Sequence, residues 1–339
     1  MEDCRFIVWC GDKGCGGLGD RVVGIVSCYI LSMYLNRKFL IHWVSPDISD
    51  AVTLNKEFSF GRISKDLNDS NVAKIRWIDQ RNEATAFLKK KKFNLWKDVS
   101  IVMIENNQMI HDCLFDAGEA PFRPEDFTQV TKSVYAKLFQ SIFEPTTDLH
   151  VLVSEYLKEV KDSELVGIQV RMGDFQMQQS FNHLERRNLS LERGKIIASQ
   201  LLQSNLKNDL QSVKKKVVVI FIGDTDMNAL AESAQTIFNN SNVAFNVKTT
   251  TTALTAMHID HCEKPCKEEI LFLFRDLLIL SHCDYVIASN NSNFGRISPY
   301  LQDKCKKKYL ITANDVDVPL AEVNDDNVMF SKEKYSLSV

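Results

Sequence analysis

The sequence lacks any long apolar stretch, since no run of about 18 or more residues is free of charged and polar side chains. It therefore predicts no transmembrane helix. The N-terminal residues Met-Glu-Asp-Cys also lack the basic region that begins a signal peptide. We expect a cytoplasmic location for the chain as given, or the lumen of the Golgi or endoplasmic reticulum if it is an ectodomain cut from a longer membrane protein.

An excess of positive charge is also missing. The formal net charge is -3, so the chain has no general field that would attract a phosphate backbone. Its lysine clusters at 89–92, 214–216 and 306–308 are short and typical of solvated surface. We therefore exclude nucleic acid as a general partner.

Full disulfide pairing is impossible, because the nine cysteines are an odd number. Cys28 and Cys283 lie in apolar runs and are predicted to be buried thiols. Motifs of hydrolases are missing too: there is no G-x-S-x-G and no recognisable Ser-His-Asp or Cys-His order. Composition and motifs thus favour reduced cysteines and give no support to a hydrolase.

Strand and helix patterns alternate along most of the 339 residues. Such alternation is typical of parallel sheets covered by helices, and the length favours two domains. The polar residues 161–163 interrupt the pattern, so we predict an N-terminal α/β domain over 1–160 and a C-terminal Rossmann-like domain with a tail over 161–339. The predicted strands of the second half are 165–170, 217–222, 243–247, 285–288 and 308–312, and its helices 190–206, 227–238, 268–281 and 294–301.

The most informative segment is 166–174, in which an apolar strand ends in Arg171 and is followed by Gly173 and Asp174. A guanidinium at the carboxyl edge of an open α/β sheet suits a phosphate ligand. The alternative is a surface arginine that pairs with Asp174.

A loop with five glycines in nine residues, 11–19, connects a predicted strand over 5–10 to a predicted helix over 20–35. Such a loop lets backbone N–H groups approach an anion at a helix N-terminus. It is not a G-x-G-x-x-G fingerprint, and a tight turn needed only for packing is the alternative.

A third block runs from Asp276 to Arg296: an apolar helix, a short strand, and a turn rich in serine and asparagine. The turn, Ser289 to Asn293, offers hydrogen-bond donors at the start of a further helix. An ordinary polar loop with a good helix cap would have the same composition.

Two clusters contain side chains of the kind that bind metals. Asp224 and Asp226 form an Asp-x-Asp pair after a predicted strand, although carboxylates there also cap helices. His258, His261, Cys262 and Cys266 crowd into nine residues, whereas structural zinc sites draw ligand pairs from separate turns. A Cys262–Cys266 disulfide or an ordinary loop fits that cluster better, and no bound metal is expected.

Taken in order, three segments resemble the GDP-fucose-dependent fucosyltransferases, which include α-1,2, α-1,6, plant xyloglucan and protein O-fucosyltransferases. The segments are Gly17-Leu18-Gly19-Asp20-Arg21, then Gln169-Val170-Arg171-Met172-Gly173-Asp174, then Asp276 to Arg296. The resemblance implies a GT-B-like fold, in which two Rossmann-like domains face each other across a cleft. It also implies metal-independent transfer of L-fucose from GDP-β-L-fucose to a glycan hydroxyl, with inversion.

The resemblance assigns roles residue by residue. Arg171 would grip the β-phosphate, Asp276 would accept hydrogen bonds from guanine, and Arg296 would brace the turn that holds the diphosphate or fucose. Asp20 or Asp174 would serve as the base. The implied catalytic residues are Arg171, Asp20 and Asp174, and the implied donor-binding residues are Gly17, Gly19, Gln169, Arg171, Asp276, Ser292, Asn293 and Arg296.

Three departures stand out. The usual histidine of the second block is Gln169, although plant members are similar here; a second arginine of some subfamilies is Met172; and Asp20 replaces an amide of the protein O-fucosyltransferases. Two alternatives therefore remain: a glycosyltransferase of the same fold that uses another nucleotide sugar, and an inactive relative that binds glycan.

Overall fold

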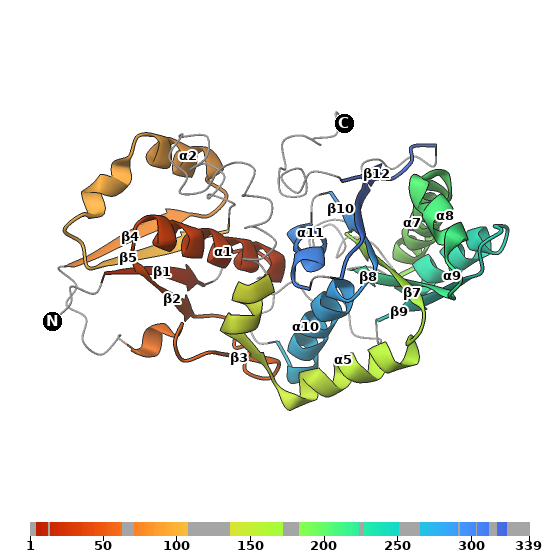
Figure 1. Cartoon of the computed structure of the whole chain (residues 1–339), viewed down its shortest axis with the longest axis horizontal. Helices are drawn as coiled ribbons and strands as arrows, with labels where there is room; N and C mark the ends of the chain where they lie inside the picture. Colours follow the sequence, from red (N-terminus) through yellow and green to blue (C-terminus); the bar gives the residue numbers. More distant parts are fainter. Residues whose placement is uncertain are drawn as a thin grey trace. The chain divides into compact units, whose positions relative to one another are not determined.

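A computed structural model of the chain shows two compact units (Figure 1). The first comprises Met1–Thr146 and Cys262–Pro265, and the second Thr147–His261 and Cys266–Val339. The structure describes residues 5–12, 14–62, 71–107, 136–171, 183–223, 227–250, 265–290, 292–302, 304–311 and 317–323.

The first unit contains a parallel sheet of four strands in the order β2-β1-β5-β4, and helix α1 follows its central strand β1. A separate antiparallel pair joins β3 to β6. The elements of this unit are β1 (Phe6–Gly11), α1 (Leu18–Tyr34), β2 (Lys38–Trp43), β3 (Val52–Leu54), η1 (Phe60–Arg62), β4 (Val72–Trp77), α2 (Arg81–Lys89), η4 (Lys92–Trp96), β5 (Ile101–Asn106) and β6 (Phe143–Pro145).

Glycine lets α1 pack closely on this sheet. A Cβ added at Gly24 would lie 1.8 Å from the carbonyl oxygen of Asn106, which only the absence of a side chain avoids. The same carbonyl accepts a hydrogen bond from Trp9 Nε1 at 2.8 Å. Thirteen of the 17 residues of α1 are buried, because the helix is apolar on nearly all sides.

The second unit contains a sheet of six strands in the order β12-β11-β10-β7-β8-β9. All neighbouring strands are parallel except β11 and β12. Its elements are α5 (Thr147–Glu159), β7 (Glu164–Val170), α7 (His183–Gln203), α8 (Asn205–Ser212), β8 (Val217–Gly223), α9 (Met227–Phe238), β9 (Phe245–Thr249), α10 (Lys267–Ser281), β10 (Tyr285–Ser289), α11 (Asn293–Ile297), η5 (Ser298–Tyr300), β11 (Lys307–Ile311) and β12 (Ala321–Glu322).

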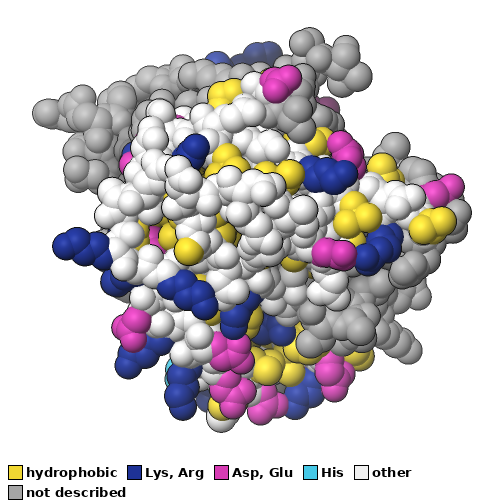
Figure 2. Space-filling view, turned by 90° about the vertical axis from the view of Figure 1, so that its right-hand side faces the viewer, with side chains coloured by type: hydrophobic (Ala, Val, Ile, Leu, Met, Phe, Trp, Pro, Cys, Tyr) yellow, Lys and Arg dark blue, Asp and Glu magenta, His cyan; other side chains and the backbone are white. Residues whose placement is uncertain are grey.

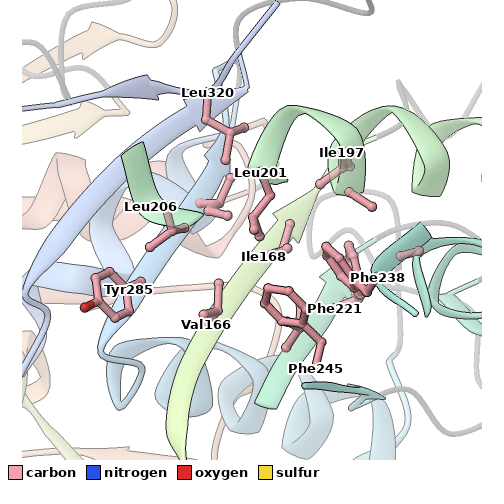
Figure 3. Packing of buried hydrophobic residues seen from close by; sticks show 14 of the residues in the cluster. Val166, Ile168, Ile197, Leu201, Leu206, Phe221, Phe238, Phe245, Tyr285 and Leu320 are labelled. Atoms are coloured by element: carbon pink, nitrogen blue, oxygen red, sulfur yellow. The ribbon is translucent and has the colours of Figure 1, made fainter. Parts of the chain in front are cut away.

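Helices cover both faces of this second sheet, because its strands are apolar on both sides. Ile168 and Phe221 point toward Ile197 and Leu201 of α7 on one face (Figure 3). On the other face Val218 and Ile220 pack with residues of α10 and α5. The predicted fold class, an α/β chain of two Rossmann-like domains, is confirmed by the two parallel sheets.

Most predicted elements of the second half lie within two residues of the observed ones, and the helix over 227–238 coincides with α9. The predicted helix 190–206 differs. It begins earlier, at His183, and breaks at Ser204, whose hydroxyl donates to the carbonyl of Leu201 at 2.7 Å. The predicted helix 294–301 becomes α11 followed by a 3₁₀ turn that contains Pro299, because proline cannot donate the α-helical hydrogen bond.

The polar residues 161–163, at which we placed the domain boundary, form a turn between α5 and β7. Asp162 has φ of +66°, the N–H of Lys161 donates to the carbonyl of Lys158 in α5 at 3.3 Å, and the N–H of Ser163 donates to the carbonyl of Val160 at 3.2 Å. Tyr156 and Leu157 of α5 pack in the same apolar cluster as Leu280 of α10. The two compact units therefore divide earlier, between Thr146 and Thr147.

Charges of both signs are interspersed on the face shown in Figure 2, where lysine and arginine side chains lie among aspartate and glutamate. No positive field dominates this face. Such a surface does not favour a polyanion.

Candidate functional site: the carboxyl end of the second sheet

The chain order of the second sheet creates one switch point. From β7 the chain continues through β8 and β9 on one side, and then returns to β10 and β11 on the other. In open α/β sheets the crevice at the carboxyl ends of the two strands flanking such a point is the usual ligand site. Here the two strands are β7 and β10, which end at Val170 and Ser289.

The residues after β7 are tied to the end of β10. The backbone N–H of Arg171 donates to Ser289 Oγ at 2.9 Å, and that hydroxyl donates to the carbonyl of Gln169 at 3.2 Å. Arg171 itself is partly exposed. The second and third predicted blocks are therefore brought together, because their strands are direct neighbours in the sheet.

Gln169 is buried, with 5% of its surface exposed. Its Oε1 accepts from the N–H of Ser289 at 3.4 Å. Gly295 of α11 lies against it, since an added Cβ would come within 2.8 Å of both the Cβ and the Oε1 of Gln169. The Gln169 side chain thus lies between β7, β10 and α11 and contacts both neighbours.

The turn after β10 opens a helix, as predicted. The N–H of Ser292 donates to the carbonyl of Ser289 at 3.0 Å, and the N–H of Arg296 donates to the carbonyl of Ser292 at 3.1 Å. Ser292 is 3% exposed, and its hydroxyl makes no capping hydrogen bond. Asn293, the first residue of α11, is half-buried, and Arg296 is fully buried.

Asp276 lies in α10 with 19% of its side chain exposed. Arg275 donates to its Oδ1 from Nε at 3.0 Å and from Nη2 at 2.8 Å. Burial raises the pKa of the Asp276 carboxyl above its ordinary value, and the Arg275 guanidinium opposes that rise. Asp276 is therefore a half-buried carboxylate with a counter-charge beside it in the sequence.

The glycine loop of the first unit is stabilised by contacts within the loop and with the first turn of α1. Gly14 and Gly16 have φ of +83° and +84°, a region that residues with a Cβ rarely adopt. The N–H of Gly17 donates to Asp20 Oδ2 at 3.0 Å. Asp20 thereby caps the first turn of α1, within which Gly19 is buried.

Arg21 has no role in the prediction from the sequence. It is fully buried, donates from Nε to the carbonyl of Gly16 at 3.2 Å and from Nη2 to the carbonyl of Asp12 at 3.1 Å, and its guanidinium lies 5.1 Å from the Trp43 ring centroid. The sequence feature that could have indicated its role is the position of an arginine directly after a glycine loop. Arg21 holds two carbonyls of the loop.

Ser289, Arg275 and Thr250 were also missed. Ser289 belonged to the predicted turn, but its partner across the sheet depends on the register of β7 and β10. Arg275 had a signal, because a cation inside an apolar helix needs a partner. No feature of the sequence indicated a role for Thr250.

Several predicted residues lie outside the described ones, namely Asp174, Asp224, Asp226, His258, His261 and Cys262. Cys266 is described and is an exposed free thiol that precedes α10. Among the described residues no three His, Cys, Asp or Glu side chains cluster in a way that could hold a metal. Cys28 and Cys283 are buried, and burial raises the pKa of both thiols.

In the part of the chain that the structure describes, we find no helix with the length and apolar character needed to cross a membrane.

No family model matches the chain. Its sequence is similar to Fucosyltransferase 2 of Arabidopsis thaliana, with 21% identity over 206 residues. That match covers 51% of this chain and 38% of the relative's length, so the chain spans well under half of the relative it matches.

Solved structures of fucosyltransferases have the same fold. A mutant of Arabidopsis thaliana FUT1 in complex with GDP superposes with a TM-score of 0.59 at 16% identity, covering 95% of this chain and 75% of that one. The NodZ α-1,6-fucosyltransferase of Bradyrhizobium, co-crystallised with GDP, gives a TM-score of 0.53 at 13% identity, covering 94% and 98%. The resemblance to the GDP-fucose-dependent fucosyltransferases, indicated by three short motifs, is thus confirmed in fold and in a partial sequence match.

Proposed function

We propose that this protein is an inverting glycosyltransferase that moves L-fucose from GDP-β-L-fucose to a sugar hydroxyl of a glycan. The observation that carries the proposal is the meeting of two motif blocks at the carboxyl end of the second sheet, where the N–H of Arg171 donates to Ser289 Oγ at 2.9 Å. This is the switch point at which the fold class binds nucleotides. The GDP complexes of FUT1 and NodZ, whose folds are similar, support the choice of nucleotide.

In the proposed reaction the bond between fucose C1 and the β-phosphate oxygen breaks while the acceptor oxygen bonds to C1. Negative charge grows on the departing diphosphate. Arg171 would neutralise it, and one well-placed donor of this kind is worth about 3–4 kcal/mol in the transition state. Ser292 and Asn293 would hold the diphosphate or the fucose, with the buried Arg296 bracing their turn.

Asp276 would accept hydrogen bonds from guanine, and Gly17 and Gly19 would let the glycine loop approach the donor. The acceptor's proton would pass to Asp20 or Asp174.

We propose that the reaction needs no metal, because a guanidinium and turn donors would compensate the diphosphate's charge. Activity after treatment with EDTA should equal that of untreated protein. A strict requirement for Mn²⁺ would instead indicate that a metal ion held by Asp224 and Asp226 compensates the negative charge of the diphosphate.

Labelled GDP-fucose offered against a glycan array tests the proposed function and identifies the acceptor. Melting-temperature shifts with GDP-fucose, GDP-mannose and UDP-sugars identify the donor, because a bound ligand stabilises the fold by mass action. A shift only with another nucleotide sugar would establish the same fold with a different donor. Glycan binding without transfer or hydrolysis of GDP-fucose would establish an inactive relative.

A further inference from the structure

Two adjacent charged residues interrupt the apolar helix α10. Arg275 is 7% exposed, and the side chain of Asp276 is 19% exposed. Neither charge could be buried at low cost without a partner. Arg275 and Asp276 therefore stabilise each other as an ion pair inside the helix.

The Arg275 side chain is fixed at several points. It donates twice to Asp276 Oδ1, at 2.8 and 3.0 Å, and its Nη2 also donates to the carbonyl of Thr250, the residue after β9. Its guanidinium lies 4.4 Å from the ring centroid of Phe272. Because a planar guanidinium held in this way cannot rotate, it also fixes the orientation of the carboxylate it contacts.

Two hydroxyls near Asp276 complete the surroundings. Tyr156 on α5 carries a buried phenol oxygen that makes no hydrogen bond among the described residues, and the Thr250 hydroxyl after β9 is close enough to Asp276 to help lower the pKa of its carboxyl. Asp276 is near enough to Tyr156 to help raise the pKa of that phenol, after burial as the main cause. Polar groups of both kinds, an acceptor and potential donors, therefore converge on one small region.

Guanine presents N–H donors beside the O6 acceptor. Both hydrogen bonds from Arg275 go to Oδ1 of Asp276, so Oδ2 takes part in neither, and we assign the guanine donors to Oδ2 beside the Thr250 hydroxyl. We propose that Arg275 is a positioning residue that holds Asp276 ionised and oriented for guanine, and so sets the preference for a guanine nucleotide. This inference rests on the proposed function.

The proposal has a consequence for pH. Asp276 must be ionised to accept from guanine, and Arg275 is the largest influence that lowers its pKa against the effect of burial. The other groups facing this region are the Thr250 hydroxyl and, on α5, Tyr156 and Glu159, of which Glu159 pairs with Lys248 of β9 at 2.9 Å. Without Arg275 the pKa of Asp276 rises further. When the solution is acidified, the variant should therefore lose GDP affinity at a higher pH than wild type does.

The experiment measures GDP and inosine diphosphate binding to the full chain by calorimetry from about pH 5 to about pH 8. Inosine diphosphate lacks the 2-amino group of guanine. Arg275→Gln should weaken GDP binding by about 10- to 100-fold, reduce the preference for GDP over inosine diphosphate, and move the acid limb of binding to higher pH. Arg275→Lys keeps the charge and should restore the acid limb, but not the full affinity.

Arg193→Gln is the matched control. Arg193 is a half-buried arginine of α7, which packs on the opposite face of the sheet, so nucleotide preference and pH profile should not change. If Arg275→Gln kept the wild-type preference and acid limb, the inference would be wrong while the proposed function stood. If wild type bound no GDP, the proposed function would fail first, and this inference with it.

Discussion

The two ends of the second sheet are held by different kinds of contact. At the amino end, Lys306 pairs with the buried Glu164 and lies 3.6 Å from Asp284, whose Oδ2 accepts from the N–H of Leu165 at 2.9 Å. At the carboxyl end, a serine hydroxyl and a glutamine amide bind backbone groups. Charge is matched to charge where the sheet begins, and neutral groups set the backbone where ligands are expected. Stability and function should therefore be separable by substitution.

The largest expected effect is at the carboxyl end. Arg171→Ala should lower the rate of fucose transfer by about 10²- to 10³-fold, because the developing charge on GDP loses its guanidinium. The melting temperature should stay near that of wild type, since Arg171 is partly exposed. Transfer rate and thermal unfolding are measured on the same preparation.

Arg187→Ala is the control for that experiment. Its side chain is 38% exposed and pairs with Glu232 at 2.8 Å, a surface ion pair of small expected value. Transfer by Arg171→Ala within about threefold of wild type, a loss below about 1 kcal/mol, would remove Arg171 from the mechanism.

At the amino end, Asp284→Ala should act on stability. The N–H of Leu165 loses its buried acceptor, which costs about 1–3 kcal/mol. Urea unfolding measures the change. GDP binding by the folded fraction should be unchanged, and a loss of GDP affinity with normal stability would contradict the division between the two ends.

Gly295→Ala should affect both properties. The new Cβ would lie 2.8 Å from Gln169 and 3.0 Å from Ala288 Cβ, so α11 or Gln169 must shift, at a cost of about 1–3 kcal/mol. Unfolding and GDP affinity are both measured. Gly61→Ala is the control, because its nearest neighbour would be the Ser59 hydroxyl at an ordinary 3.6 Å. Equal effects of the two substitutions would show that α11 is not closely packed.

The smallest effect concerns alkaline pH. The pKa of Lys306 is raised from 10.5, first by its hydrogen bond to Glu164, so its contribution to stability is present below 10.5 and is lost as pH rises through the folded-state value. Lys306 is 51% exposed, and screening by water keeps this contribution small. As pH rises from about 10 to about 12, wild type should lose slightly more stability than Lys306→Met. If the stability of the two proteins changed with pH in the same way, Lys306 would not contribute to the pH dependence.

The sequence predicted the strands of the second sheet well, because β-branched runs such as 217–222 favour buried parallel strands over helices. It also predicted the turn that opens at Ser292. It did not predict the contact of Arg171 with Ser289, since the register between β7 and β10 depends on packing of the whole sheet. The carbonyl that anchors Arg275 lies 25 residues away along the chain, and no local pattern indicates such a partner.

The placement of α5 has a practical consequence for anyone who expresses the second unit alone. A fragment that starts at residue 161 would omit Tyr156, Leu157 and Val160, and would leave the apolar cluster they share with α10 open to water. Such a fragment is expected to aggregate. One that starts at Thr147 retains the helix and its cover over that side of the sheet.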